Sequence, residues 1–78
     1  MKDALTYIIT SIVDNQNDVA ISEETDEQGT IHFIIHVAKE DVGKIIGKDG
    51  KVIRAIRNVM KIPAIKQNKR IRIDISEA

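Results

Sequence analysis

The sequence contains no cysteine, a single proline and only two aromatic residues, Tyr7 and Phe33. The lack of cysteine excludes disulfide cross-links, thiolate metal sites and cysteine nucleophiles. A small domain without disulfides is typical of a reducing compartment, so we expect a cytoplasmic protein. No apolar run approaches the roughly 18 residues that a membrane-spanning helix needs, so we expect no membrane partner.

The length and the charge distribution limit the remaining possibilities. A chain of 78 residues is enough for one small domain. Such a domain buries only roughly 60–65% of its unfolded surface, so dimerisation would supplement its stability. Residues 1–38 hold one basic and seven acidic side chains, whereas residues 39–72 hold eleven basic and three acidic ones. The formal net charge is zero, but the basic half can attract a polyanion.

The first half of the chain predicts one helix and a hairpin. Apolar residues recur with helical spacing over Lys2–Val13. Alternation predicts strands over Val19–Glu24 and Thr30–Val37, joined by a turn at Thr25–Gly29. The apolar face of the predicted helix consists of Leu5, Ile8, Ile9 and Ile12.

The second half predicts two helices and a strand. Asp41 is expected to cap a short helix with an apolar face of Val42, Ile45 and Ile46. A second helix over Lys51–Lys61 would end before Pro63, because proline disrupts helix interiors. Alternation then predicts a strand over Arg70–Ser76. The buried stripe of the second helix is expected to be Ile53, Ile56, Val59 and Met60.

The order helix, strand, strand, helix, helix, strand predicts an α+β fold. The strands Thr30–Val37 and Arg70–Ser76 are separated by a helical crossover, which favours parallel pairing with right-handed topology. We therefore expect a three-stranded mixed sheet with three helices on one face. The other face would be solvated and carry His32, His36, Arg72 and Asp74.

Three glycines, at 43, 47 and 50, lie in a basic stretch that reads GKIIGKDGK. The spacing does not match a P-loop, and Asp49 stands where that loop requires serine or threonine. The dinucleotide-binding pattern also fails, because it requires a single residue between its first two glycines, whereas three residues separate Gly43 from Gly47. A plain turn between helices needs only one glycine. Here two glycines, Gly47 and Gly50, flank Lys48 and Asp49, which is more than such a turn needs.

A clamp for a nucleic-acid backbone fits the same stretch better. Gly47 and Gly50 would let the main chain approach a sugar-phosphate chain closely. The helix beginning near Lys51 offers free N–H groups to an anion, and Lys48 and Lys51 add positive charge. The apolar residues Val42, Ile45 and Ile46 would form a floor for bases.

The stretch from Ile45 to Ile53 resembles the core motif of the KH (K-homology) domain, whose loop is glycine, two variable residues, glycine. The helix and strand before that core resemble the type II arrangement, and the whole chain is similar to small bacterial single-KH RNA-binding proteins. The resemblance implies one KH domain over residues 1–78, with an N-terminal extension over about 1–28 and a core over about 29–78. It also implies that about four nucleotides of single-stranded RNA are held.

The same resemblance implies dimerisation, a larger Jag-type partner with its own KH domain, and a role as an RNA chaperone or post-transcriptional regulator. Asp49 offsets Lys48 within the loop, so affinity would depend on other cations, including Lys44, Arg54 and the Lys66–Arg72 region. We expect weak binding with modest sequence preference, because no aromatic residue in the motif offers a stacking platform. The candidate RNA-binding residues are Val42, Lys44, Ile45, Ile46, Gly47, Lys48, Asp49, Gly50, Lys51, Arg54, Lys69, Arg70 and Arg72.

Two other functional classes compete with RNA binding. One is a dimerisation or adaptor module that docks a larger KH-containing protein and has little RNA affinity of its own. The apolar residues Met60, Ile62, Ala64 and Ile65 around Pro63 could provide part of such an interface. The other is an enzyme, which we do not expect, because no nucleophile–base pair or metal constellation appears. His32 and His36 would lie ~13 Å apart on a strand, so we predict no metal site and no cofactor.

Overall fold

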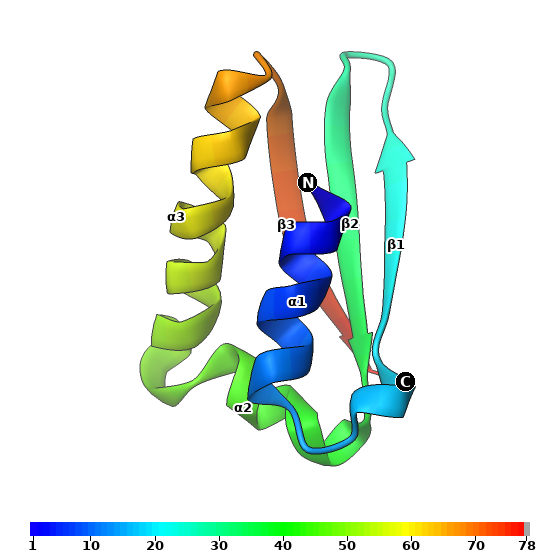
Figure 1. Cartoon of the computed structure of the whole chain (residues 1–78), viewed down its shortest axis with the longest axis vertical. Helices are drawn as coiled ribbons and strands as arrows, with labels where there is room; N and C mark the ends of the chain where they lie inside the picture. Colours follow the sequence, from blue (N-terminus) through cyan, green and yellow to red (C-terminus); the bar gives the residue numbers. More distant parts are fainter. Residues whose placement is uncertain (78) are drawn as a thin grey trace.

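The computed structural model describes residues 1–77 and the side chains of residues 1–76. Three helices lie against one face of a three-stranded sheet (Figure 1). The predicted α+β fold with the order αββααβ is confirmed. Its helices and strands are α1 (Lys2–Ile12), β1 (Ala20–Thr25), β2 (Thr30–Val37), α2 (Val42–Ile46), α3 (Lys51–Lys66) and β3 (Arg70–Glu77). Short 3₁₀ turns lie at Gln16–Asp18, Lys39–Asp41 and Lys48–Gly50.

The sheet has the strand order β1-β2-β3, so β2 is central and β3 is an edge strand. β1 pairs with β2 in antiparallel orientation, and β2 pairs with β3 in parallel orientation. The register places Phe33 opposite Ile73 and Ile31 opposite Ile71. The predicted mixed sheet is therefore confirmed, including the parallel pair across the helical crossover.

The hydrophobic core fills the space between the sheet and the helices. Every second residue of β2 is buried, as the alternation in its sequence predicted. The helices supply the opposite side of the core through the helical spacing of their apolar residues. The main side chains that meet there are Leu5, Ile9, Ile31, Phe33, Ile35, Val37, Ile45, Ile53, Ile56, Met60 and Ile73.

The opposite face of the sheet carries polar side chains, as expected. Arg72 and Asp74 are exposed there, while His32 and His36 are half-buried. His32 Nε2 lies 2.8 Å from Asp26 Oδ2, and His36 Nε2 lies 3.0 Å from the hydroxyl of Ser22. Both histidines therefore pair with neighbouring polar groups on this face.

The prediction that Pro63 ends the second helix was wrong, because α3 continues through Pro63 to Lys66. Proline removes one intrahelical hydrogen bond, but Met60 and Ala64 on either side of it are 1% and 3% exposed. Their packing holds the last turn of α3 against the sheet. The helix instead ends where Asn68 takes a positive φ of 55°, with Lys69 N donating to Ala64 O at 2.8 Å. That bond and the one from Asn68 N to Ile65 O form a Schellman motif.

Val59 was also misassigned to the buried stripe of α3. Its side chain is 51% exposed, whereas Ile53, Ile56 and Met60 are buried as expected. Ile62 and Ile65 are 58% and 75% exposed. The outer side of α3 therefore carries an apolar surface, which we call the outer α3 surface, formed by Val59, Ile62 and Ile65.

Asp41 precedes α2, but its side chain makes no capping hydrogen bond to that helix, contrary to expectation. The carboxylate is buried, and it accepts hydrogen bonds from the backbone N–H groups of Asp14 and Asn15 at 3.2 and 3.0 Å. The amide group of Asn15 donates a further bond to it at 3.0 Å. Asp41 therefore ties the chain after α1 to the start of α2.

These contacts make the stability of the fold sensitive to acid. Burial raises the pKa of Asp41, but the hydrogen bonds from Asn15 and Asp14, together with the charge of Lys44, outweigh burial and hold the pKa below its ordinary value. A carboxyl whose pKa is lower in the folded state stabilises the fold above the unfolded pKa. That contribution is lost as the pH falls through the folded pKa.

We therefore predict that Asp41→Asn lowers the melting temperature at pH 7 and flattens its decline below about pH 4. Melting curves followed by circular dichroism between pH 7 and pH 2.5 measure both effects. Asp26→Asn is the matched control, because hydrogen bonds from His32, Thr30 and Gln28 also lower the pKa of this carboxyl, but its exposure to solvent should make both effects smaller. An Asp41→Asn protein with the wild-type melting temperature at pH 7 would contradict the structural role of Asp41.

Candidate nucleic-acid interface

The glycine loop joins α2 to α3 and has a backbone that few residues can adopt. Gly47 has φ 74° and ψ 174°, and Gly50 lies in the left-handed region with φ 73° and ψ 17°. Asp49 also has a positive φ of 57°, which aspartate tolerates better than most residues. A single turn closed by the bond from Gly50 N to Gly47 O, at 3.2 Å, results from these angles.

The two glycines that flank Lys48 and Asp49 differ in what surrounds them. A Cβ on Gly47 would lie 2.3 Å from Val52 Cγ2 and 2.9 Å from Val52 N. A Cβ on Gly50 would meet no atom within 4 Å. Gly47 is therefore needed for the close packing of the loop on α3, whereas Gly50 is needed for its angles and leaves open space beside the backbone.

The loop brings positive groups to the start of α3. No side chain caps the N-terminus of α3, and its first turn contains no acidic residue. The Gly50 and Lys51 N–H groups donate to Gly47 O and Lys48 O within the turn, and the helix dipole favours an anion at this end. Lys48 and Lys51 are exposed on either side of Gly50. This is the part of the predicted site that the structure brings together.

The expected floor for bases is smaller than the sequence indicated. Ile45 has no exposed surface and belongs to the core, so it cannot contact a base. Val42 is half-buried, and Ile46 is 39% exposed. The helical spacing of these residues was read correctly, but α2 turns Ile45 toward the sheet and leaves Ile46 as the accessible member.

Lys44 is already engaged by the protein. Its ammonium group forms an ion pair and hydrogen bond with Asp14 and lies 3.8 Å from the carboxylate of Asp41. The hydrogen bond from Lys44 to Asp14, helped by the charges of Asp14 and Asp41, raises the pKa of Lys44 above its ordinary value despite partial burial. Its positive charge is therefore compensated locally.

A groove runs between α3 and the free edge of β3, with a volume of about 350 Å³. We call it the edge groove. Arg57 reaches across it from α3 and donates to the carbonyl oxygen of Ile73 from Nε at 3.1 Å and from Nη2 at 2.9 Å. The groove is lined by Arg57, Ile71, Arg72, Ile73 and Asp74.

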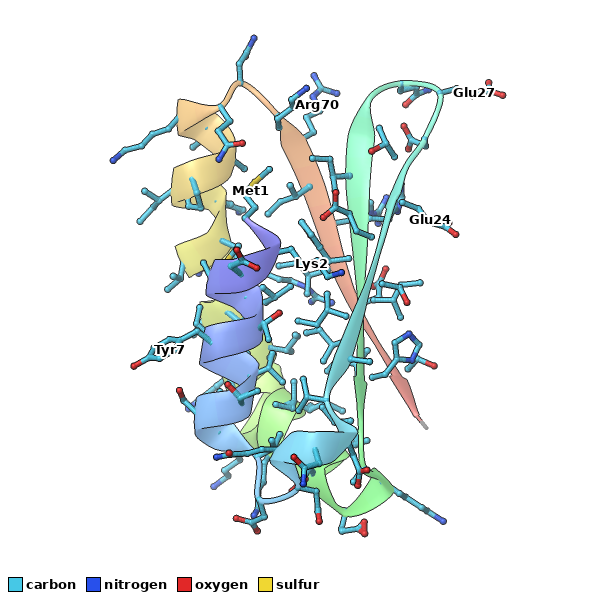
Figure 2. The ribbon with its side chains drawn as sticks, turned by 45° about the vertical axis from the view of Figure 1, so that its right-hand side comes forward. Met1, Lys2, Tyr7, Glu24, Glu27 and Arg70 are labelled. Atoms are coloured by element: carbon cyan, nitrogen blue, oxygen red, sulfur yellow. The ribbon has the colours of Figure 1, made fainter. Side chains whose placement is uncertain are left out.

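A second, more basic pocket continues from the edge groove toward the end of α3. Ile71 and Arg72 line both, and the second pocket adds Lys61, Lys69 and Arg70 together with Gln28, Thr30, Ala64 and Ile65. The pocket is lined by α3 from Lys61 to Ile65, and a rise of 1.5 Å per residue from Lys51 places it about 15–20 Å from the glycine loop. Figure 2 shows Arg70 at the same end of the sheet as Glu27 of the hairpin turn.

The candidate residues therefore form two separate groups. Lys48, Lys51 and, one helical turn further on, Arg54 lie at the loop end of α3. Lys69, Arg70 and Arg72 lie toward the other end, next to the acidic hairpin turn.

Arg57 and Lys61 are not among the candidate residues that the sequence predicted. Both line the side of α3 that faces β3. The signal that was available is the spacing of Arg54, Arg57 and Lys61 at i, i+3 and i+7, which places three cations on one helix face.

The structure shows no arrangement typical of a metal site. Within residues 1–77 no group of three or more histidine, aspartate or glutamate side chains lies close enough to hold a metal ion. None of the helices in the described part of the chain is long and apolar enough to cross a bilayer.

An αββααβ chain with a glycine–two residues–glycine loop between its second and third helices is a KH domain of the type II arrangement. The comparison with known families agrees and is more specific. Residues 2–75 match the KH domain described as KhpA/KhpB, and the chain belongs to this family.

Several curated bacterial proteins are similar to this chain along nearly their whole length. The RNA-binding protein KhpA of Clostridium acetobutylicum is 47% identical over 75 residues, covering 96% of this chain and 99% of the relative. The protein of the same name from Chlamydia caviae is 46% identical over 80 residues, covering 99% and 97%. That from Listeria monocytogenes is 38% identical over 78 residues, covering 99% and 100%.

The geometry of the loop predicts unequal effects of alanine at its two glycines. Gly47→Ala should cost about 3 kcal/mol of stability or more, because it adds backbone strain and a steric clash with Val52. Gly50→Ala should cost about 1–2 kcal/mol, the penalty for a left-handed residue in open space. Urea denaturation of both variants measures the difference, and equal losses would contradict the packing described for Gly47.

Proposed function

We propose that the chain binds single-stranded RNA and holds the RNA backbone against the glycine loop. The observation that supports this most directly is the uncapped N-terminus of α3 beside Gly50, whose free side leaves room for a phosphate to approach the main chain. Lys48 and Lys51 flank that position, and the names of the relatives point to the same ligand class. RNA bound there would extend along α3 past Arg54 into the edge groove.

The contributions of the candidate residues differ in this proposal. Gly47, Lys48, Asp49, Gly50 and Lys51 form the grip on the backbone. Ile46 and Val42 offer the apolar surface for bases, and Ile45 supports them from the core. Arg54 and Arg72 follow the edge groove. Lys44, Lys69 and Arg70 contribute less, because Lys44 is paired with carboxylates and the other two lie far from the loop.

The cellular setting is part of the same proposal. The chain acts as one KH domain in the cytoplasm, as an RNA chaperone or post-transcriptional regulator and not as an enzyme. Its partner is a second copy of the chain or a larger KH-domain protein of the KhpB (Jag) type. The outer α3 surface supports such an association, because a group of exposed apolar side chains on one helix is typical of a protein contact surface.

RNA binding is tested by reversing the charge of the loop. Lys48→Asp combined with Gly50→Asp should greatly weaken binding of a short labelled RNA pool, measured by fluorescence anisotropy. Three phosphate contacts, from Lys48, Lys51 and Arg54, predict a log–log salt slope of about −2 for the wild type. Affinity should then fall roughly 15- to 20-fold between 50 and 200 mM salt.

The matched control is Lys39→Asp combined with Gly29→Asp. Lys39 is exposed, and Gly29 also has a positive φ with open space around it, so the control has the same chemistry in other turns. Circular dichroism checks that both proteins fold. Equal binding by the two variants would move the RNA away from the loop, and no binding by the wild type would favour the adaptor function.

The partner surface is tested separately. If the outer α3 surface mediates self-association, Ile65→Asp should convert a dimer to a monomer, because it buries a charge in an apolar contact. Light scattering of the wild type and the variant measures the mass. Tyr7→Asp serves as a control, because Tyr7 on α1 is similarly exposed (Figure 2). An unchanged dimer in Ile65→Asp would place the interface elsewhere.

A further inference from the structure

One buried carboxylate lies directly before α2, the helix that leads into the glycine loop. Asp41 is 1% exposed, and no other polar or charged residue among residues 1–76 is buried. Burying a carboxylate costs free energy unless hydrogen bonds compensate its charge. The hydrogen bonds that Asp41 accepts therefore indicate what this carboxylate holds in place.

The carboxylate joins two segments that are far apart in the chain. Its Oδ1 accepts a hydrogen bond from the N–H of Asp14 at 3.2 Å, and its Oδ2 accepts bonds from the N–H and the amide group of Asn15, both at 3.0 Å. A second link runs beside it, because Lys44 pairs with Asp14 and lies 3.8 Å from Asp41. The segment after α1 therefore holds both the residue before α2 and the first turn of α2.

α2 needs such anchors, because it is too short to be stable by itself. It has five residues, little more than one turn. Figure 1 shows α2 at the C-terminal end of α1. Ile45 fixes the middle of α2 in the core. At the far end Gly47 packs on Val52, where a Cβ would lie 2.3 Å from Val52 Cγ2. The carboxylate of Asp41 is the corresponding contact at the near end.

The place of the glycine loop depends on the direction of α2, because Gly47 follows the last residue of this helix. Six residues separate Asp41 from Gly47, about 9 Å along a helical path, so a tilt of about 10° displaces one end relative to the other by about 1.5 Å. A binding site works only when its groups are held within about 0.5 Å of their productive places. Loss of the anchor at Asp41 would therefore disturb the loop.

We infer that Asp41 is a positioning residue for RNA binding, whose buried carboxylate fixes α2 on the segment after α1 and thereby places the glycine loop for the RNA backbone. The inference rests on the RNA binding proposed above and deepens it. Asp41 acts through α2 and does not touch RNA, because its side chain is buried. Asp14 and Asn15 take part in the same way, as the partners that hold the carboxylate.

The experiment measures RNA binding after this link is broken. Asp41→Asn keeps the shape of the side chain but replaces one acceptor oxygen with an NH2 group that faces N–H donors. At a temperature where circular dichroism shows the protein to be folded, its affinity for the labelled RNA pool should fall about tenfold, the loss expected when about one tenth of the molecules hold the competent loop. The log–log salt slope should stay at about −2, because no phosphate contact is removed.

Asn15→Ala is a milder variant that removes only the bond from the side-chain amide, and it tests the link even if Asp41→Asn does not fold. It should weaken RNA binding by a smaller factor. The double variant should bind no more weakly than Asp41→Asn alone, because both changes act on one link. In both single variants the backbone amide signals of Gly47 and Gly50 should shift in NMR spectra of the free protein.

Leu5→Val is the control for a loss of stability alone, with Leu5→Ala where a larger loss is needed to match Asp41→Asn. Leu5 is fully buried about two helical turns before the end of α1 and takes no part in the link. It should lower the melting temperature and leave the RNA affinity and the two glycine signals unchanged.

Two results would overturn the inference and leave the proposed RNA binding intact. One is wild-type RNA affinity in a folded Asp41→Asn or, if that variant does not fold, in Asn15→Ala. The other is an equal loss of affinity in a Leu5 variant of matched stability. Wild type that binds no RNA would overturn the proposed function and the inference together.

Discussion

The parallel pairing of β2 with β3 is the constraint on which the rest of the structure depends. Parallel neighbours cannot be joined by a hairpin, so the chain must leave the end of β2 and return to the start of β3 through a crossover. Here the crossover is α2, the glycine loop and α3. The return makes α3 run against the direction of β3 (Figure 1), which places the loop at one end and Lys69 and Arg70 at the other. It also leaves β3 at the edge, where Arg57 can reach a main-chain carbonyl.

The features that could be predicted from the sequence are those that a local pattern determines. Alternation determined β2 and β3, helical spacing determined α1, and the glycine spacing located the loop. The errors have a common cause in contacts between distant segments. Pro63 lies inside α3 because Met60 and Ala64 pack on the sheet. Rules based on the local sequence do not include this packing energy. Asp41 binds Asp14 and Asn15, more than 25 residues away in the chain. The bond between Arg57 and Ile73 likewise requires the fold to be known.

The electrostatics follow from the same arrangement. A chain with zero net charge can still present a positive surface, because its acidic residues lie mostly in the first half and its basic residues in the second. The fold then compensates part of that basic half. Lys44 is held by Asp14 and Asp41, and the acidic hairpin turn lies at the same end of the sheet as Arg70 (Figure 2). Lys48, Lys51 and Arg54 form one basic group beside the N-terminus of α3, and the second basic group lies around Lys61, Lys69, Arg70 and Arg72.

In the proposed binding mode, a loop that contains both Lys48 and Asp49 would bind through its main chain more than through its charge. The backbone angles of Gly47 and Gly50 fix the main chain of the loop before any ligand arrives, so little ordering entropy would be lost on binding. The number of phosphate contacts is nevertheless small, and each site by itself should be weak. Association through the outer α3 surface would put two such loops on one particle. A second loop that can reach the same RNA raises the overall affinity by about 10²–10⁴-fold without new contacts. Self-association and RNA binding would therefore be two parts of one function, because two weak binding sites on one particle together give a higher affinity for RNA than one site does.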